Sequence, residues 1–254
     1  MTGPAARILL SLGLMLAGTA AASAADIKLM TTGAFRPVAQ DVIPAFEKQT
    51  GNKVAIVSDT AGALIRRLRA GETFDVIVLT SDGLDALADV GTVTGDSITP
   101  LARVGIGVAV SLNAPQPDIY SVEAFRQTLL KARRIAYMDP ATGSTSGNAL
   151  VQIFQALGIS SEVSRKAVLV RSGPAGEAVA RGDADLALQQ ASELRLVPTV
   201  RFAGLLPDAI QVYTTYSGAI SAVTHEQEAS TALLAALSDP GLAPVLKRRG
   251  LEAP

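Results

Sequence analysis

The chain has 254 residues with 22 basic and 23 acidic side chains, so its formal net charge at pH 7 is −1. This balance predicts no basic surface for nucleic acid, and the absence of cysteine excludes disulfides and thiol chemistry. A single histidine excludes a zinc or manganese site made of several histidines.

The N-terminal segment predicts export. "MTGPAARILLSLGLMLAGTAAASAAD" begins with one basic residue, Arg7, continues with a short apolar stretch and ends in small residues up to Ala24. This order is typical of a secretory signal peptide, and the apolar stretch is shorter than the roughly 20 residues that span a bilayer. We predict that residues 1–24 are a signal peptide, cleaved near Ala24, and that the mature protein is periplasmic.

Strands and helices alternate along the first half of the mature chain. The apolar runs lack polar alternation, as expected for strands that helices cover on both faces. Each run is followed by a segment with helical spacing of its apolar residues. The expected strands are 27–32, 54–59 and 74–80, and the helices that follow them are 37–49, 61–70 and 82–90.

The same alternation restarts after a glycine-containing strand, "VGIGVAV" at 104–110, and a proline-rich turn. The expected later elements are helices 121–132, 147–157 and 174–181, strands 134–139, 167–171 and 184–190, a strand pair at 199–207 and 209–223, and helices 225–237 and 241–248. This pattern predicts an α/β protein of two lobes, each a mostly parallel sheet flanked by helices, joined by crossing hinge strands. We assign 25–104 plus 218–254 to lobe 1 and 105–217 to lobe 2.

Four strand-to-helix junctions are rich in hydroxyl and small side chains: 31–34, 58–62, 79–82 and 142–147. Ligands of open α/β sheets bind at the carboxyl ends of strands, where helix N-termini offer free N–H groups and a partial positive charge. The junctions therefore predict an anion site. The last of them, in "MDPATGSTSG", lacks the Gly-x-x-x-x-Gly-Lys spacing of a nucleotide-binding loop.

Several segments together resemble periplasmic molybdate-binding proteins, the solute receptors of ABC importers with the type II periplasmic binding protein fold. They are "IKLMTTGAFRPVAQDVIPAFEKQTG", "AGETFDVIVLT", "PLARVGIGVAV", "YMDPATGSTSG" and "VLKRRGLE". The resemblance covers about Asp26 to Leu251 and implies an ABC permease as partner. The serines that bind the anion in this family correspond here to Ala34 and Ala61. The other pocket positions of the family correspond to Thr80, Ser146, Gly147, Ser172 and Gln190.

Two further side chains are candidates on their own chemistry. Arg171 ends a predicted strand and could fork two hydrogen bonds to a carboxylate. Tyr213 and Tyr216 are three residues apart on a strand and face opposite sides, so one of them lines the cleft. The predicted ligand-binding residues are Thr32, Gly33, Ala34, Thr60, Ala61, Gly62, Thr80, Thr145, Ser146, Gly147, Arg171, Ser172, Gln190 and Tyr213.

We predict a monomeric solute receptor, without cofactor or metal, that closes on a small anion. The resemblance ranks a molybdate- or tungstate-class oxyanion first, whereas Ala34, Ala61 and Arg171 favour a small organic carboxylate. A sensing receptor that is not coupled to transport stays as a further alternative. The sequence also predicts that the chain is not an enzyme, since only carboxylates remain as bases and those considered, Asp75, Asp82, Asp139 and Asp185, lie where turns or caps explain them.

Overall fold

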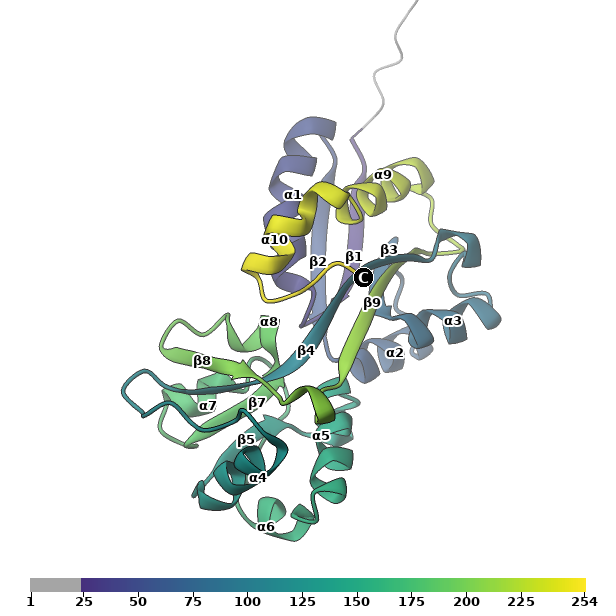
Figure 1. The fold of residues 1–254 in the computed structure, drawn as a ribbon. Coiled ribbons are helices and arrows are strands. Elements are labelled where there is room, and N and C mark those ends of the chain that lie inside the picture. The colour runs from purple at the N-terminus through teal and green to yellow at the C-terminus, as the bar shows by residue number, and fades with distance from the viewer. Residues whose placement is uncertain (1–23) are drawn as a thin grey trace, which may run out of the picture.

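The computed structural model describes residues 24–254. The predicted signal peptide, apart from Ala24, lies outside the described residues. The described chain forms two lobes of sheet and helix, one above the other in Figure 1, with two strands running between them. The strands are β1 Asp26–Thr32, β2 Lys53–Asp59, β3 Val76–Thr80, β4 Thr99–Ser111, β5 Ile135–Met138, β6 Ala167–Val170, β7 Leu186–Gln190, β8 Val200–Leu205 and β9 Tyr213–Ile220.

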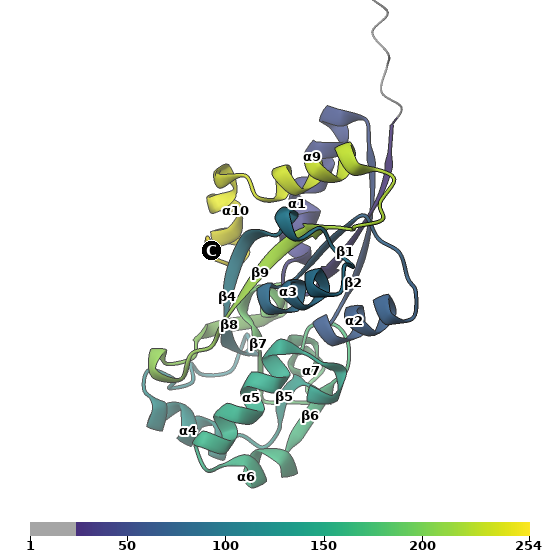
Figure 2. The same cartoon turned by 90° about the vertical axis from the view of Figure 1, so that its right-hand side faces the viewer.

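Helices cover both faces of the sheet in each lobe (Figures 1 and 2). In lobe 1, α1, α9 and α10 pack on one side and α2 and α3 on the other. In lobe 2, α4, α5 and α6 pack opposite α7 and α8. The helices are α1 Arg36–Thr50, α2 Ala61–Arg69, α3 Ser81–Asp89, α4 Val122–Lys131, α5 Thr145–Ala156, α6 Ser160–Arg165, α7 Gly176–Ala180, α8 Ala191–Leu194, α9 Gln227–Leu237 and α10 Ala243–Arg248, with short 3₁₀ turns η1 Gly95–Ser97, η2 Pro140–Thr142, η3 Asp208–Ile210 and η4 Pro240–Leu242.

The strand order is β2-β1-β3-β9-β4-β7-β5-β6, with β8 paired to β4. Strands β1, β2 and β3 are mutually parallel, as are β5, β6 and β7, whereas β4 and β9 run antiparallel to their neighbours. Three parallel strands per lobe place three carboxyl ends at one edge of each sheet. The predicted fold class is confirmed.

Strand β4 belongs to both sheets. Its first part, Thr99–Gly105, pairs with β9, and its second part, from Ile106 to Val110, pairs with β7. The chain therefore passes between the lobes near Gly105 and returns before β9. On this basis we propose two lobes with the first boundary at 104/105, as predicted, and with the return to lobe 1 before Tyr213 instead of at 217/218.

The lobes have separate hydrophobic cores. The largest cluster of lobe 1 packs α1 and α9 on the sheet and includes Phe35, Val38 and Leu233, none of which is exposed to solvent. The largest cluster of lobe 2 is centred on Phe125 of α4 and Leu150 of α5. Two cores with the cleft between them leave the polar junctions at that cleft free for a ligand.

Three elements differ most from the predictions, and β9 is also shorter than predicted because η3 occupies residues 208–210. Strand β4 starts five residues earlier than predicted, since Pro100 is accommodated by a register shift between Pro100 and Ala102. Helices α6 and α8 were not predicted, because segments of six and four residues are too short to display a helical period. The second omission affects the site described below.

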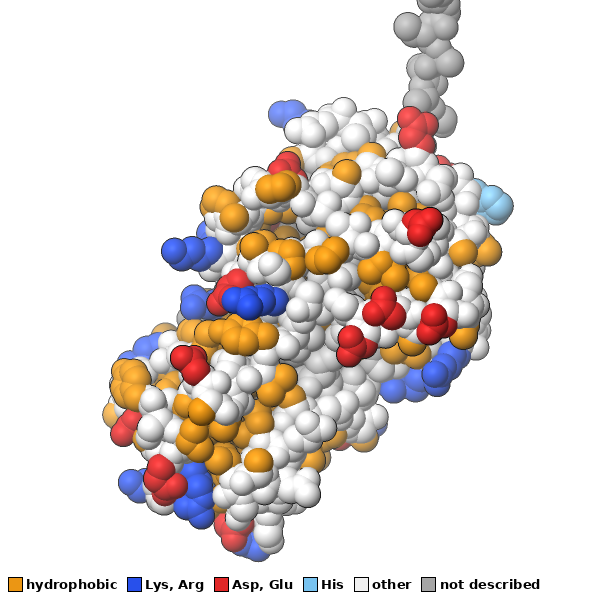
Figure 3. Space-filling view, turned by 45° about the vertical axis from the view of Figure 1, so that its right-hand side comes forward, with side chains coloured by type: hydrophobic (Ala, Val, Ile, Leu, Met, Phe, Trp, Pro, Cys, Tyr) orange, Lys and Arg blue, Asp and Glu red, His pale blue; other side chains and the backbone are white. Residues whose placement is uncertain are grey.

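Within residues 24–254, no single helix is long and apolar enough to cross a membrane. Helix α9 and the segment Pro240–Arg248, which meet at a bend of 44°, together have the length and composition of a membrane span. Figure 3 shows acidic and basic side chains interspersed over one face of the molecule.

Candidate functional site

A cavity of about 150 Å³ lies between the lobes. It is smaller than the roughly 300–1,000 Å³ of pockets that hold drug-sized ligands, so it suits a small solute. Both lobes contribute to its wall. The lining residues are Thr32, Gly33, Ala34, Arg36, Ser58, Asp59, Thr60, Ala61, Met138, Ser144, Thr145, Ser172, Gly173, Pro174, Gln189, Gln190, Glu193, Leu196 and Tyr216.

The starts of three helices converge on this cavity. The Thr60 side chain caps α2 by accepting a hydrogen bond from Ala63 N at 3.2 Å, and Ser144 caps α5 by accepting from Gly147 N at 3.3 Å. Helix α1 begins at Arg36 without a side-chain cap. These helix starts carry partial positive charge, so the cavity favours a ligand with negative charge.

Glu193 places a carboxyl group inside the cavity. It lies on α8 of lobe 2, directly after β7, and its Oε1 abuts the backbone of Gly33 in lobe 1, where a Cβ atom would overlap it. Burial raises the pKa of Glu193 to about 7, and the Gln189 amide and the positive charge of Arg36 oppose that rise. A carboxyl with this pKa can both take up and release a proton at neutral pH.

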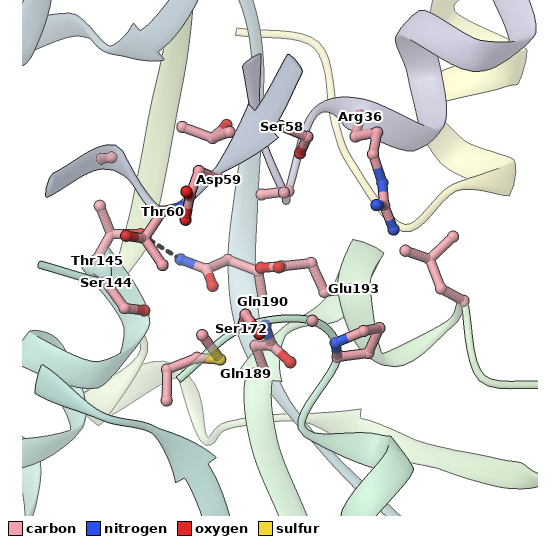
Figure 4. Close-up of a pocket in the computed structure, with 18 of the residues that line it drawn as sticks. Arg36, Ser58, Asp59, Thr60, Ser144, Thr145, Ser172, Gln189, Gln190 and Glu193 are labelled. Atoms are coloured by element: carbon pink, nitrogen blue, oxygen red, sulfur yellow. Dashed lines mark hydrogen bonds between the residues drawn. The ribbon is translucent and has the colours of Figure 1, made fainter. Parts of the chain in front are cut away.

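Arg36 is the cationic side chain that lines the cavity. Figure 4 shows Arg36 and Glu193 on one side of the cavity, with Thr60, Ser144 and Thr145 on the other. The buried Nε atom of Arg36 has no hydrogen-bond partner within the described chain. Buried polar atoms are almost always paired, so this cavity residue indicates that a polar ligand completes the site.

A chain of hydrogen bonds links Glu193 to the rest of the site. With the Gln190 amide turned so that its nitrogen faces Ser146 Oγ, that nitrogen lies 2.8 Å from Ser146 Oγ and 3.2 Å from Glu193 Oε2. The amide oxygen then accepts from Thr145 Oγ1 at 2.6 Å. Figure 4 draws the amide in the opposite orientation, with its nitrogen donating to Thr145 Oγ1. Thr145 Oγ1 in turn lies 3.2 Å from the Tyr216 hydroxyl. The network fixes the position of the Glu193 carboxyl.

Asp59 is the second carboxyl at the cavity wall. Its Oδ1 accepts from Thr60 N at 2.8 Å, and its Oδ2 lies 4.0 Å from Arg67 Nη1. Both oxygens thus face groups of its own lobe. Asp59 is held as a partner of the α2 N-terminus and of Arg67, whereas the Glu193 carboxyl faces the cavity from across the cleft.

The structure brings eight of the fourteen predicted ligand-binding residues together at the cavity. These are Thr32, Gly33, Ala34, Thr60, Ala61, Thr145, Ser172 and Gln190. They come from the predicted junctions 31–34, 58–62 and 142–147 and from the ends of β6 and β7. Their role as ligand contacts stays a prediction.

The other six lie outside the cavity wall. Thr80 caps α3, and Gly62 contacts Gly143. Ser146 is buried against Ser144, and Gly147 lies against the Met138 carbonyl. Arg171 has a side chain that is 79% exposed and lies 3.9 Å from Asp139. The Tyr213 ring stacks under Arg103, whereas Tyr216, three residues on, lines the cavity.

Sequence reasoning missed Arg36 and Glu193. Arg36 could have been identified because it directly precedes Pro37 at the start of the first helix, where a side chain lies near the carboxyl end of the preceding strand. Glu193 could have been found by applying the strand-end rule to 184–190, since it follows that strand by three residues.

The fold and this cavity define a two-lobed binding protein of the periplasmic type. A family model described as bacterial extracellular solute-binding protein matches residues 27–252. The chain therefore belongs to this family of bacterial extracellular solute-binding proteins, which agrees with the resemblance seen in the sequence.

Individual relatives carry different names. A Pseudomonas protein named aconitate isomerase is 37% identical over 252 residues, which are 96% of this chain and 95% of that protein. The Azotobacter vinelandii periplasmic molybdate-binding protein has a TM-score of 0.75 at 20% identity and covers 90% of this chain and 99% of its own. The sulfate-binding protein SubI of Mycobacterium tuberculosis has a TM-score of 0.71 at 19% identity and covers 90% and 87%.

The prediction that the chain is not an enzyme is contradicted. A family member that is 37% identical over nearly the whole chain is named for an isomerase activity. The prediction considered only aspartates in turns and caps and did not include Glu193, whose pKa is raised to about 7, a shift of the kind that occurs at functional sites.

Proposed function

We propose that this protein isomerises an unsaturated tricarboxylic acid of the aconitate class by moving a proton between two carbon atoms. The observation that carries the proposal is the Glu193 carboxyl, with a pKa of about 7, facing the cavity on the same side as Arg36, whose buried Nε has no partner within the described chain. The name of the 37% identical relative supports the substrate class.

Binding would use groups that favour carboxylates. Arg36 offers a forked pair of donors, and the helix starts at Thr60 and Ser144 supply positive potential at the opposite wall. The side chains of Thr32 and Gln189, which also line the cavity, add two hydrogen-bonding groups. Donors on several sides suit a ligand with several carboxylates better than a single tetrahedral oxyanion.

The chemical step needs no cofactor. The Glu193 carboxylate takes a proton from the methylene carbon, and the electrons of that C–H bond form the new double bond. The old double bond shifts its electrons to the far carbon and into the carboxylate attached there, whose growing negative charge Arg36 and the helix starts stabilise. The protonated Glu193 carboxyl then supplies a proton to that carbon, so the double bond moves by one position and atoms and electrons balance.

The other ionisable groups at the cavity are less suited to this step. Burial raises the pKa of Tyr216 above its ordinary value, so its hydroxyl stays protonated and serves as a hydrogen-bond donor. Asp59 is engaged by Thr60 N and Arg67 on its own lobe. Glu193 is therefore the group to which we assign proton transfer.

A direct assay tests the proposal. We expect the purified protein, without any added permease, to convert trans-aconitate to cis-aconitate, followed by proton NMR. Tri- and dicarboxylates should raise the melting temperature, by an amount that corresponds to roughly 2.7 kcal/mol at about 100 times the dissociation constant. A response to molybdate, tungstate or sulfate alone, with no turnover of aconitate, would contradict the proposal and return the oxyanion to first place.

The rate should depend on pH in one direction near neutrality. Because Glu193 acts as a base only when ionised, kcat/KM should rise with pH through an apparent pKa of about 7 and then level off. A profile that is flat between pH 5 and 9, or that falls over this range, would contradict the assignment of the base. Measuring the heat of tricarboxylate binding over the same range separates a loss of binding from a loss of chemistry.

A second candidate function is solute delivery to an ABC permease. The family and the molybdate- and sulfate-binding structural neighbours favour it. Tight binding of a tricarboxylate without turnover would favour this receptor role over the isomerase.

A further inference from the structure

Two glycines from different lobes touch across the cleft. Gly62 lies in the first turn of α2, and Gly143 follows η2 in the loop before α5. Gly62 N donates to Gly143 O at 3.1 Å. A Cβ atom on Gly62 would lie 2.6 Å from Gly143 Cα and 2.9 Å from Thr142 O. The approach is thus possible only when residue 62 has no side chain.

The neighbouring Thr142 carbonyl accepts two more hydrogen bonds from the same helix. Thr60 Oγ1 donates to Thr142 O at 2.9 Å, and Arg66 Nη2 donates to it at 3.2 Å. Three donors from the first turns of α2 therefore hold two consecutive carbonyls of the other lobe. We call this set of three hydrogen bonds and the touching Cα atoms the glycine contact.

The glycine contact can form only when the lobes are closed. Its two sides belong to separate sheets, and the chain joins those sheets through β4 and the segment before β9. The N–H group of Gly62 has no acceptor within its own helix, because it is among the first four of α2. Its hydrogen bond to Gly143 therefore reports the relative position of the lobes.

The position of Glu193 depends on the same closure. Glu193 comes from lobe 2, yet its Oε1 abuts Gly33 of lobe 1. The other ionisable side chains that line the cavity with it are Arg36 of α1, Tyr216 of β9 and Asp59 of β2. Separating the lobes would move the carboxyl away from Gly33 and Arg36 and admit water to it.

We propose that the glycine contact is a lock between the lobes that positions the Glu193 carboxyl beside Arg36 for proton transfer. Gly62, Gly143 and Arg66 act in it as positioning residues, since none of the three lines the cavity. The role of Glu193 rests on the proposed isomerase function, whereas the lock itself rests on the contacts between the lobes.

The variant Gly62→Ala tests the lock, with Gly95→Ala as its matched control. Gly95 is an exposed lobe 1 glycine whose added Cβ would find its nearest neighbour at 3.8 Å. We expect exchange of the backbone amide at position 62, followed by NMR, to be slow in the wild type and fast in Gly62→Ala. If closure falls to about one tenth, the apparent Kd for tricarballylate, a saturated and unreactive tricarboxylate, rises about tenfold.

Turnover should respond in a way that a general loss of fold would not reproduce. In Gly62→Ala, kcat/KM on trans-aconitate should fall about tenfold or more, and its apparent pKa should move from about 7 towards the ordinary value, because Glu193 becomes hydrated. The melting temperature should change little. Arg66→Met, which removes one of the three hydrogen bonds, should show the same changes in smaller degree.

The outcomes separate the lock from the isomerase. The lock is supported if the wild type shows slow amide exchange at position 62 and tight tricarballylate binding, and if Gly62→Ala loses both. This holds even if trans-aconitate is not converted. In that case only the isomerase proposal fails. Equal exchange at position 62 in the wild type and in Gly62→Ala, or unchanged binding and turnover in this variant, overturns the lock. If tricarballylate does not bind, the rate of amide exchange at position 62, compared between the ligand-free wild type and Gly62→Ala, tests the lock by itself.

Discussion

Replacing Glu193 with glutamine is expected to lower kcat for aconitate isomerisation by about 10²–10⁴-fold, the usual contribution of a positioned acid or base. Glutamine keeps the length and the acceptor oxygen of Glu193 but takes up no proton. The variant should still bind tricarballylate with an affinity close to that of the wild type. The measurement is a kcat and a Kd for each protein, by NMR and by calorimetry.

The fold of Glu193→Gln can be checked by its stability. The pKa of Glu193 is raised in the folded protein from 4.5 to about 7, so this group's contribution to stability is lost as the pH rises from about 4.5 to 7 and is absent above it. Glutamine does not ionise, and the variant should therefore melt at least as high as the wild type at pH 8. Activity that survives within a few-fold would show that another group moves the proton.

Replacing Arg36 with methionine is expected to have the second largest effect. Truncating one partner of a buried charged hydrogen bond costs roughly 2–5 kcal/mol, so the apparent Kd for tricarboxylates should rise about 30-fold or more. Since the charge of Arg36 lowers the pKa of Glu193, the apparent pKa of the remaining activity should move above 7. Arg36→Lys should keep the lower pKa while losing the forked donor geometry.

Arg171→Met is the matched control for this experiment. Arg171 was the arginine predicted to bind a carboxylate, yet its side chain is 79% exposed and lies outside the cavity. Its replacement should leave binding and the pH profile unchanged. A large loss in Arg171→Met together with little change in Arg36→Met would reverse the assignment of the carboxylate-binding arginine.

The fold was predictable because long apolar strands and amphipathic helices leave strong patterns. The parallel order of β1–β3 and of β5–β7 followed from short buried runs with helices between them. The main errors concern short or irregular elements, such as α8, with four residues, and the early part of β4, which contains Pro100. Periodicity needs about two turns to be visible, so it cannot detect such segments.

The site was predictable where it is made of backbone and helix starts, and it was missed where one side chain decides the chemistry. The junctions at 31–34, 58–62 and 142–147 converge as strand order requires. That Arg36 rather than Arg171 reaches the cavity depends on side-chain direction, and the pKa of Glu193 depends on burial between two lobes. Neither quantity can be read from one chain's residue order.

The path of the chain through the two sheets has a consequence for the order of folding. Strands β5, β6 and β7 are complete by Gln190, whereas β3 of the first lobe must wait for β9 at Tyr213–Ile220. Contacts between distant segments form slowly because a long loop must first be closed. The middle of the polypeptide can thus acquire its structure before the beginning does, and a chain truncated before Tyr213 would leave the β3 edge unpaired and prone to association.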